Sequence, residues 1–160
     1  MKKILTACST ILLALSCVAC TSLPKPDTTA VCTLSTNIDG IQYKSTYTME
    51  YHKEKYLVLS LKAEDAYTNL DNEPFSVNIR KDLGMKASEL TSIEGLEALV
   101  RDETDAEYFQ LTIDGENLDI EDMVKKYPTY EAWIQDNQLN IDNVTQDLTN
   151  QGYSCDLDFE

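Results

Sequence analysis

Apolar and polar residues alternate between positions 31 and 61, which is the pattern of β-strands with one buried face. Asp39-Gly40 supplies a turn after the first alternating run. A charged reversal, Lys53-Glu54-Lys55, follows the second run. We therefore expect a three-stranded antiparallel meander, with strands at residues 31–38, 43–52 and 56–62.

The middle of the chain mixes helical and strand signals. Pro74 is placed to open a helix, whose apolar positions recur at helical spacing at Ile79, Leu83, Ala87 and Leu90. Residues 96–101 fit a helix or a strand. Residues 108–114 predict a strand that ends in a turn.

The last third of the chain reads as helical. Asp119 caps one run, Pro128 stops it, Thr129 opens a second short helix, and a third ends at Gly152. The predicted fold class is α+β. It has an antiparallel sheet, built from the meander and a hairpin, with helices packed on one face and a helical C-terminal third.

The N-terminus has the features of a bacterial lipoprotein signal peptide. Lys2 and Lys3 precede an uncharged, mostly apolar run over residues 4–16, which is too short to span a bilayer. Residues 15–20, Leu-Ser-Cys-Val-Ala-Cys, resemble a lipobox, in which the cysteine after the cut carries a lipid. Cys20 is the predicted lipidation site, because its use leaves two cysteines that can pair, and Cys17 is the alternative.

Cleavage before Cys20 divides the chain into three parts. Residues 1–19 are the signal peptide, residues 20–30 are the lipidated cysteine and an extended tether, and residues 31–160 are one globular domain. Long acyl chains such as palmitate hold a protein on a membrane surface without spanning it. The expected location is therefore extracytoplasmic, on the cell membrane.

Charge and composition exclude several classes of protein. The 160 residues include 28 acidic and 13 basic ones, a formal charge of −15, which argues against nucleic-acid binding. Losing Lys2 and Lys3 leaves 11 basic residues and a charge of −17. The single histidine excludes multi-histidine metal sites, no EF-hand loop fits, and we expect neither metal nor cofactor.

Cys32 and Cys155 stand near the two ends of the predicted domain. A disulfide between them would close a long loop, and the exported location permits it. Two buried free thiols or a redox pair are the alternatives, although no Cys-x-x-Cys motif survives processing.

Three tyrosines, Tyr43, Tyr47 and Tyr51, share one face of the second predicted strand. We expect this face to pack on the helices as core. If it faces outward instead, it forms an amphipathic surface of the kind that binds partners or glycans.

Several short motifs are similar to those of a known family. They lie at residues 46–55 (Thr-Tyr-Thr-Met-Glu-Tyr-His-Lys-Glu-Lys), 93–97, 111–114 and 152–155. Through these the chain resembles the YehR-like lipoproteins, bacterial envelope proteins of uncharacterised function. The resemblance implies that residues 96–101 form a strand paired with residues 108–114. It also implies a disulfide like that of the Gram-positive members, and it supplies no catalytic residues.

The leading functional hypothesis is a non-enzymatic envelope lipoprotein that binds a partner or ligand. No nucleophile motif or phosphate loop is present, and at −17 the domain attracts cationic partners. A small envelope hydrolase that uses a carboxylate pair is the alternative.

Overall fold

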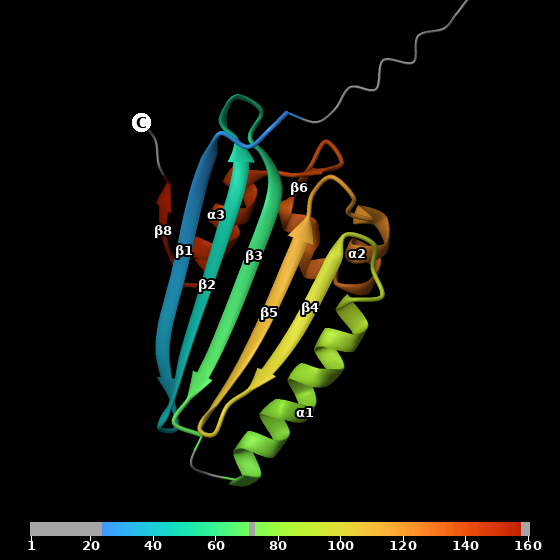
Figure 1. The fold of residues 1–160 in the computed structure, drawn as a ribbon. Coiled ribbons are helices and arrows are strands. Elements are labelled where there is room, and N and C mark those ends of the chain that lie inside the picture. The colour runs from blue at the N-terminus through green and yellow to red at the C-terminus, as the bar shows by residue number, and fades with distance from the viewer. Residues whose placement is uncertain (1–23, 71–72, 158–160) are drawn as a thin grey trace, which may run out of the picture.

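The computed structural model describes residues 24–70 and 73–157, and for residues 73–76 the backbone alone. Six strands form one antiparallel sheet in the order β4-β5-β3-β2-β1-β8 (Figure 1). The bounds of these strands are β1 Thr28–Ile38, β2 Ile41–His52, β3 Leu57–Thr68, β4 Leu96–Asp102, β5 Ala106–Asp114 and β8 Ser154–Leu157.

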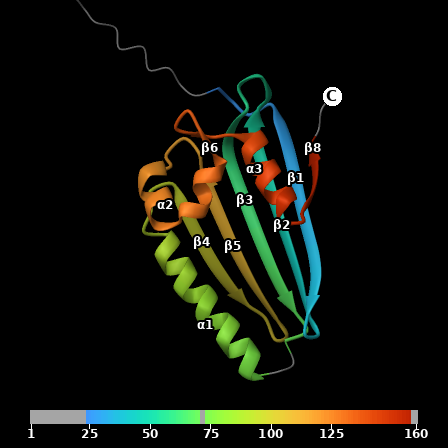
Figure 2. The same ribbon diagram turned by 180° about the vertical axis from the view of Figure 1, so that it is seen from behind.

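The helices all lie on one side of this sheet. Figure 2 shows α2 and α3 in front of the strands and α1 running beside β4 and β5. The helical elements are α1 Glu73–Leu90, α2 Ile120–Lys126 and α3 Ile141–Asn150, with short 3₁₀ segments η1 Lys53–Lys55 and η2 Pro128–Trp133. None of the described helices combines the length and the apolar character needed to cross a membrane.

The two hairpins of the meander follow from local backbone chemistry. Asp39 and Gly40 both adopt positive φ, +53° and +93°, as a two-residue turn between twisted strands requires. At the other end, η1 closes on Tyr56, which is left-handed at φ +55°, and a bulge falls between Glu50 and Tyr51. These turns fix the register of β1, β2 and β3, and the three predicted strands are present.

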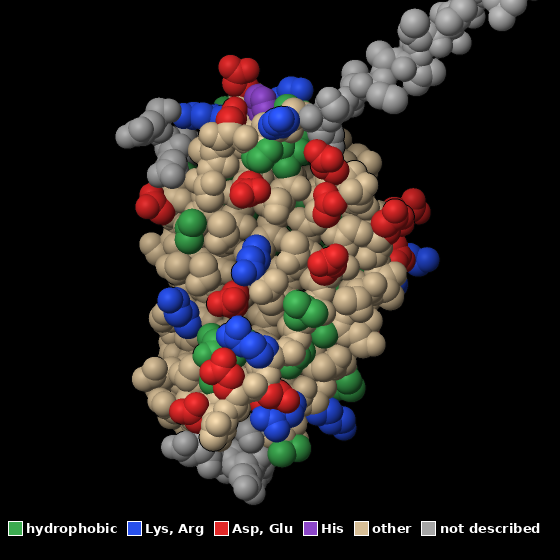
Figure 3. All heavy atoms as spheres, viewed as in Figure 1, with side chains coloured by type: hydrophobic (Ala, Val, Ile, Leu, Met, Phe, Trp, Pro, Cys, Tyr) green, Lys and Arg blue, Asp and Glu red, His purple; other side chains and the backbone are tan. Residues whose placement is uncertain are grey.

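The hydrophobic core lies between the sheet and the helices. Met49, Leu61 and Ile113 are fully buried on the strands, and Val144 and Leu148 of α3 are fully buried against them. The opposite, open face of the sheet is polar, and Figure 3 shows acidic and basic side chains mixed across it. The sheet is therefore amphipathic, as its alternating sequence predicts.

The predicted α+β fold with a helical C-terminal third is wrong. The protein is mostly antiparallel β-sheet, and residues 134–157 include three strands. Two of them, β6 Ile134–Gln135 and β7 Gln138–Leu139, form a small hairpin whose turn residues, Asp136 and Asn137, have positive φ. Asparagine and aspartate tolerate that conformation, so the chain reverses where a helix was expected.

The third of these strands, β8, adds to the main sheet as an edge strand beside β1. The four residues of β8 are too few to show a periodicity, so the sequence pattern did not predict this strand. The helix predicted from Pro74 corresponds to α1, and the strand implied by the resemblance at residues 96–101 corresponds to β4. The Asp119 cap is also present, with Oδ1 accepting a bond from Asp122 N at 2.9 Å.

The domain begins earlier than predicted. The expected tether ran to Ala30, but β1 starts at Thr28 and Ala30 is fully buried. Asp27 N already donates to the Tyr51 carbonyl at 3.1 Å. The Pro- and Thr-rich composition suggested a linker, but pairing with β2 and burial of Ala30 hold these residues in the sheet.

Candidate functional site

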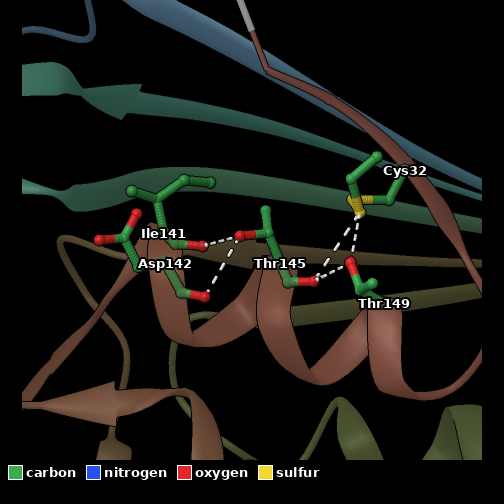
Figure 4. The surroundings of a disulfide bond; sticks show 6 residues. Cys32, Ile141, Asp142, Thr145 and Thr149 are labelled. Atoms are coloured by element: carbon green, nitrogen blue, oxygen red, sulfur yellow. Dashed lines mark hydrogen bonds between the residues drawn. A yellow bond between two sulfur atoms is a disulfide. The ribbon is translucent and has the colours of Figure 1, made fainter.

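The predicted disulfide between Cys32 and Cys155 is present and joins β1 to β8. The bond lies against α3, where Thr149 Oγ1 is 3.8 Å from Cys155 Sγ (Figure 4). It links residues 123 positions apart and so secures both ends of the domain. The two candidate lipidation residues, Cys17 and Cys20, lie outside the described residues.

The three tyrosines predicted to share a face all point to the helix side of the sheet. Tyr51 is 2% exposed. Tyr47 packs edge-on against Trp133 and Tyr153, with ring centroids 6.1 and 5.4 Å away. Tyr43 is only half-buried. Tyr47 and Tyr51 therefore belong to the core, and Tyr43 lies at its margin.

Cross-strand neighbours on the helix-facing side form rows whose character changes along the strands. The apolar row, near the β2–β3 turn, consists of Ala30, Met49, Leu61, Ile113 and Leu96. Two distal rows lie near the β1–β2 turn. They consist of Leu34, Ser45, Asp65, Phe109 and Val100, and of Thr36, Tyr43, Tyr67, Glu107 and Asp102.

Three of the four buried polar side chains of the described chain lie in the distal rows: Ser45, Asp65 and Glu107. Ser45 Oγ accepts a bond from Tyr153 OH at 2.9 Å, which satisfies both groups. Asp65, only 8% exposed, accepts from Tyr43 OH at 2.9 Å. Buried carboxylates without a cation are uncommon, so Asp65 requires an explanation.

Aromatic rings flank Asp65. The rings of Tyr43 and Tyr67 lie 4.9 Å apart and are tilted by 42°. Burial and the negative charge of Asp65 raise the pKa of Tyr67 to about 12 and raise the pKa of Tyr43 further. Both phenols therefore stay protonated, and Tyr43 keeps the proton that it donates to Asp65.

The β5 half of the distal rows holds a second buried carboxylate, Glu107, and this one has a cation. Arg80 of α1 donates through Nε to Glu107 Oε1 at 2.6 Å, and Nη2 contacts the same oxygen. Arg80 Nε also lies 3.0 Å from Asp102 Oδ1. Glu107 Oε2 is buried and has no hydrogen-bond partner among the described residues.

Burial outweighs the arginine for Glu107. Desolvation raises its pKa, and the neighbouring Asp102 carboxyl raises it further, while Arg80 lowers it. A second basic residue of α1 covers the same half of the rows, because Lys86 Nζ lies 4.5 Å from the centre of the Phe109 ring. The chain thus supplies both a carboxylate and a ring of β5 with a cation.

The β3 half of the distal rows lacks this covering. Among the described residues, no basic side chain forms an ion pair with Asp65. Figure 2 shows α3 across the other halves of β1–β3, and no helix of the described chain crosses their distal ends. Tyr43 and Tyr67 are correspondingly half-buried. We take Asp65, Tyr43 and Tyr67 as the candidate site and call them the tyrosine–aspartate site.

Other sequence candidates lie elsewhere. His52 is at the β2–β3 turn, with Nδ1 3.9 Å from Asp27 Oδ2. Within the described ranges, no three histidine, cysteine or acidic side chains gather closely enough to hold a metal ion. A hollow of about 440 Å³ at the distal end is lined by Tyr43 of the tyrosine–aspartate site and by Asn37 and Lys44 among others, and its lysine does not suit a cation.

Sequence reasoning did not identify Asp65 or Glu107 as buried carboxylates, and it did not single out Arg80. A signal was present: Asp65 continues the buried phase of Leu61 and Ala63, and Glu107 stands in phase with Phe109. A charged residue at a buried position of an alternating strand marks a place where the core stops being apolar.

Comparison with known proteins identifies the family but gives no activity. Residues 21–158 match the family described as "Domain of unknown function (DUF8824)", so the chain belongs to that family. No curated protein matches. A solution NMR structure of a protein from Streptococcus pneumoniae TIGR4 is similar, with 14% sequence identity and a TM-score of 0.46, over 98% of this chain and 96% of that one.

Proposed function

We propose that this member of the DUF8824 family is a lipid-anchored, extracytoplasmic envelope protein whose domain binds a cationic ligand without transforming it. One observation carries the binding proposal: the chain places its own cations over the β5 half of the distal rows, whereas no basic side chain of the described residues pairs with Asp65 in the β3 half. An ammonium or guanidinium group of a ligand would pair with Asp65 as Arg80 pairs with Glu107. It would also lie against the Tyr67 ring as Lys86 lies against the Phe109 ring.

The chemistry of the tyrosine–aspartate site matches such a group. A partly desolvated carboxylate strengthens a charge-assisted hydrogen bond, and the faces of tyrosine rings attract cations. The formal charge of −17 expected for the mature chain adds long-range attraction that weakens with salt. Basic segments of envelope proteins and small organic cations are the ligand classes that fit.

The alternative of a hydrolase has weaker support from this geometry. A carboxylate pair that cleaves a glycosidic bond must exchange protons with its substrate. Asp102 and Glu107 instead share the guanidinium of Arg80. We therefore favour binding over catalysis.

Titration with hexalysine, and with hexaglutamate as its opposite in charge, tests the binding proposal. We expect hexalysine to bind and Asp65→Asn to weaken it about tenfold or more, because a hydrogen bond to a charged group contributes about 1.5–3 kcal/mol. Glu64→Gln is the matched control, since it removes the same charge from the next residue of β3, on the open face. Equal weakening by both variants would show nonspecific attraction and contradict the site.

The anchor is tested by the intact mass of protein extracted from membranes, alkylated with and without reductant. We expect a chain that starts at Cys20 and carries acyl groups, with two thiols that appear only after reduction. A chain starting at Cys17, or a species without lipid, would overturn the proposed processing. The resemblance to the YehR-like lipoproteins supports the same anchor.

A further inference from the structure

The chain enters the domain directly beside the β2–β3 turn. Asp27 N donates to the Tyr51 carbonyl at 3.1 Å, and Asp27 Oδ1 accepts from Lys53 N at 2.9 Å. His52 Nδ1 lies 3.9 Å from the other oxygen of Asp27. These contacts from both sides fix the entry point of the chain to this end of the sheet.

The side chains around the entry point differ from the rest of the surface. We call Lys25, Asp27 and residues 52–56 the entry tip. It carries three lysines, the single histidine and two carboxylates, whereas the whole chain has more than twice as many acidic as basic residues. Lys25 and Lys55 are exposed, and Tyr56 is 50% exposed. Figure 3 shows both basic and acidic side chains around the histidine.

The fold holds Tyr56 in a fixed position at this tip. Its left-handed backbone, φ +55°, is rare for a residue with a bulky side chain. Tyr56 N donates to the Lys53 carbonyl at 3.3 Å, and the Tyr56 carbonyl accepts from Ile141 N at 2.9 Å. These bonds attach the turn to the start of α3, so the exposed Tyr56 ring stands on an ordered turn.

We propose that the entry tip contacts the anionic headgroups of the membrane and stands the domain on its end, with the distal rows pointing away from the bilayer. The proposal rests on the lipid anchor at Cys20 described under Proposed function. Asp27 is the seventh residue after Cys20, and this stretch spans at most about 25 Å when fully extended. The tip is therefore the part of the domain that the anchor holds nearest to the lipid.

Charge and ring chemistry favour the same orientation. An anionic membrane repels a domain of formal charge −17, and Lys25, Lys53 and Lys55 offset that repulsion locally when the entry tip faces the lipid. Lysine and tyrosine are suited to the headgroup region, where a charged or polar tip stays wet and the apolar part is covered. Tyr43 lies nine residues along β2 from His52, about 30 Å away, so the tyrosine–aspartate site would face outward.

Two exposed hydrophobic residues at opposite ends of the sheet provide a matched pair of probes. Tyr56 is 50% exposed at the entry tip, and Ile38 is 48% exposed at the distal end. Tyr56→Cys and Ile38→Cys each introduce a single reactive thiol, because Cys32 and Cys155 are bonded. The acylated protein, labelled with a fluorophore, is reconstituted into phosphatidylcholine vesicles with or without phosphatidylglycerol, each containing a nitroxide-headgroup lipid.

We expect the label at position 56 to be quenched several-fold more than the label at position 38, and more strongly in the anionic vesicles. Adding Lys25→Glu and Lys55→Glu should remove that anionic increment. The control pair Lys44→Glu and Lys62→Glu makes the same charge change on the open face, and it should leave the increment in place.

Two results would overturn the proposal. Equal quenching at positions 38 and 56 would mean that the domain has no fixed orientation, and equal effects of the two lysine pairs would mean that the tip has no special role. Failure of the lipid anchor is a distinct outcome, because a protein without acyl chains would stay in the supernatant of both vesicle types. That result would overturn the anchor and the orientation together.

Discussion

The two ends of the helix-facing side of this sheet differ in the kind of side chain that they bury. Near the β2–β3 turn, the apolar row is covered by helices and excludes water by packing alone. Near the β1–β2 turn, the same strands bury Ser45, Asp65 and Glu107 beside half-exposed tyrosines. The apolar row contributes stability, whereas the distal rows carry groups whose burial costs free energy unless they find partners.

The difference extends to the halves of the distal rows. Helix α1 supplies Arg80 and Lys86 over β5, where Arg80 bonds one oxygen of Glu107 and the other has no hydrogen-bond partner among the described residues. Over β3, Asp65 has the Tyr43 hydroxyl and no ion pair among the described residues. A fold that neutralises one buried carboxylate and not its neighbour leaves the second available to a ligand. Stability and binding should therefore separate along a single sheet.

Leu61→Ala in the apolar row and Tyr67→Leu in a distal row should separate the two properties most clearly. Leu61 is fully buried, so we expect its truncation to lower the free energy of unfolding by about 3–5 kcal/mol. Tyr67→Leu keeps most of the volume and should cost less than about 1.5 kcal/mol. Urea unfolding gives both values.

Hexalysine binding should respond in the opposite way. Loss of the Tyr67 ring removes a cation–π contact of about 1 kcal/mol, which corresponds to roughly fivefold weaker binding. Folded Leu61→Ala protein should bind as the unaltered protein does. The comparison between the two ends fails if Leu61→Ala weakens binding more than Tyr67→Leu.

Removing the disulfide should have the next largest effect on stability. Cys32→Ala with Cys155→Ala releases a constraint over 123 residues, and we expect a loss of about 2–4 kcal/mol. Adding reductant to the unaltered protein should reproduce the loss, whereas the double variant should not respond. Hexalysine affinity of the folded double variant should stay the same, because β8 pairs with β1 only at residues 30–33, outside the distal rows. Unchanged unfolding in reductant would contradict the structural role of the bond.

Strand alternation sufficed to locate the meander, because each strand has one face in the core and one in water. The phase of Tyr47 and Tyr51 followed from the same alternation. It did not reveal that the core becomes polar at Asp65 and Glu107, since both stood among 28 acidic residues in the sequence. Only the register across β3, β5 and α1 brings Glu107 to Arg80 and leaves Asp65 with Tyr43.

The wrong prediction of a helical C-terminal third has a different cause. Residues 134–139 are too few to show a period, and their reversal depends on positive φ at Asp136 and Asn137. The edge strand β8 exists because β1 offers unpaired backbone groups, and the Cys32–Cys155 bond joins the two strands there. The second cause is not local to the residues of β8. Pairing of this kind cannot be inferred from the periodicity of a four-residue segment.

The smallest expected effect concerns the pH dependence of stability at Glu107. Burial raises its pKa above the ordinary 4.5, so between these two values the folded protein binds more protons than the unfolded chain. The contribution of this group to stability therefore falls as pH rises from 4.5 through the raised pKa, by at most about 1.4 kcal/mol per pH unit. Glu107→Gln removes the titrating carboxyl group. It also removes the ion pair with Arg80, which changes the difference in unfolding free energy between the two proteins by the same amount at every pH.

Urea unfolding of Glu107→Gln and the unaltered protein across this pH range isolates the effect, because all other groups titrate in both. The variant should gain stability relative to the unaltered protein as pH rises from 4.5, and the gain should level off above the raised pKa. A gain that grows toward acid pH would mean that Arg80 outweighs burial. The β5 half of the distal rows would then hold a fully charged pair, and its contrast with Asp65 would be greater still.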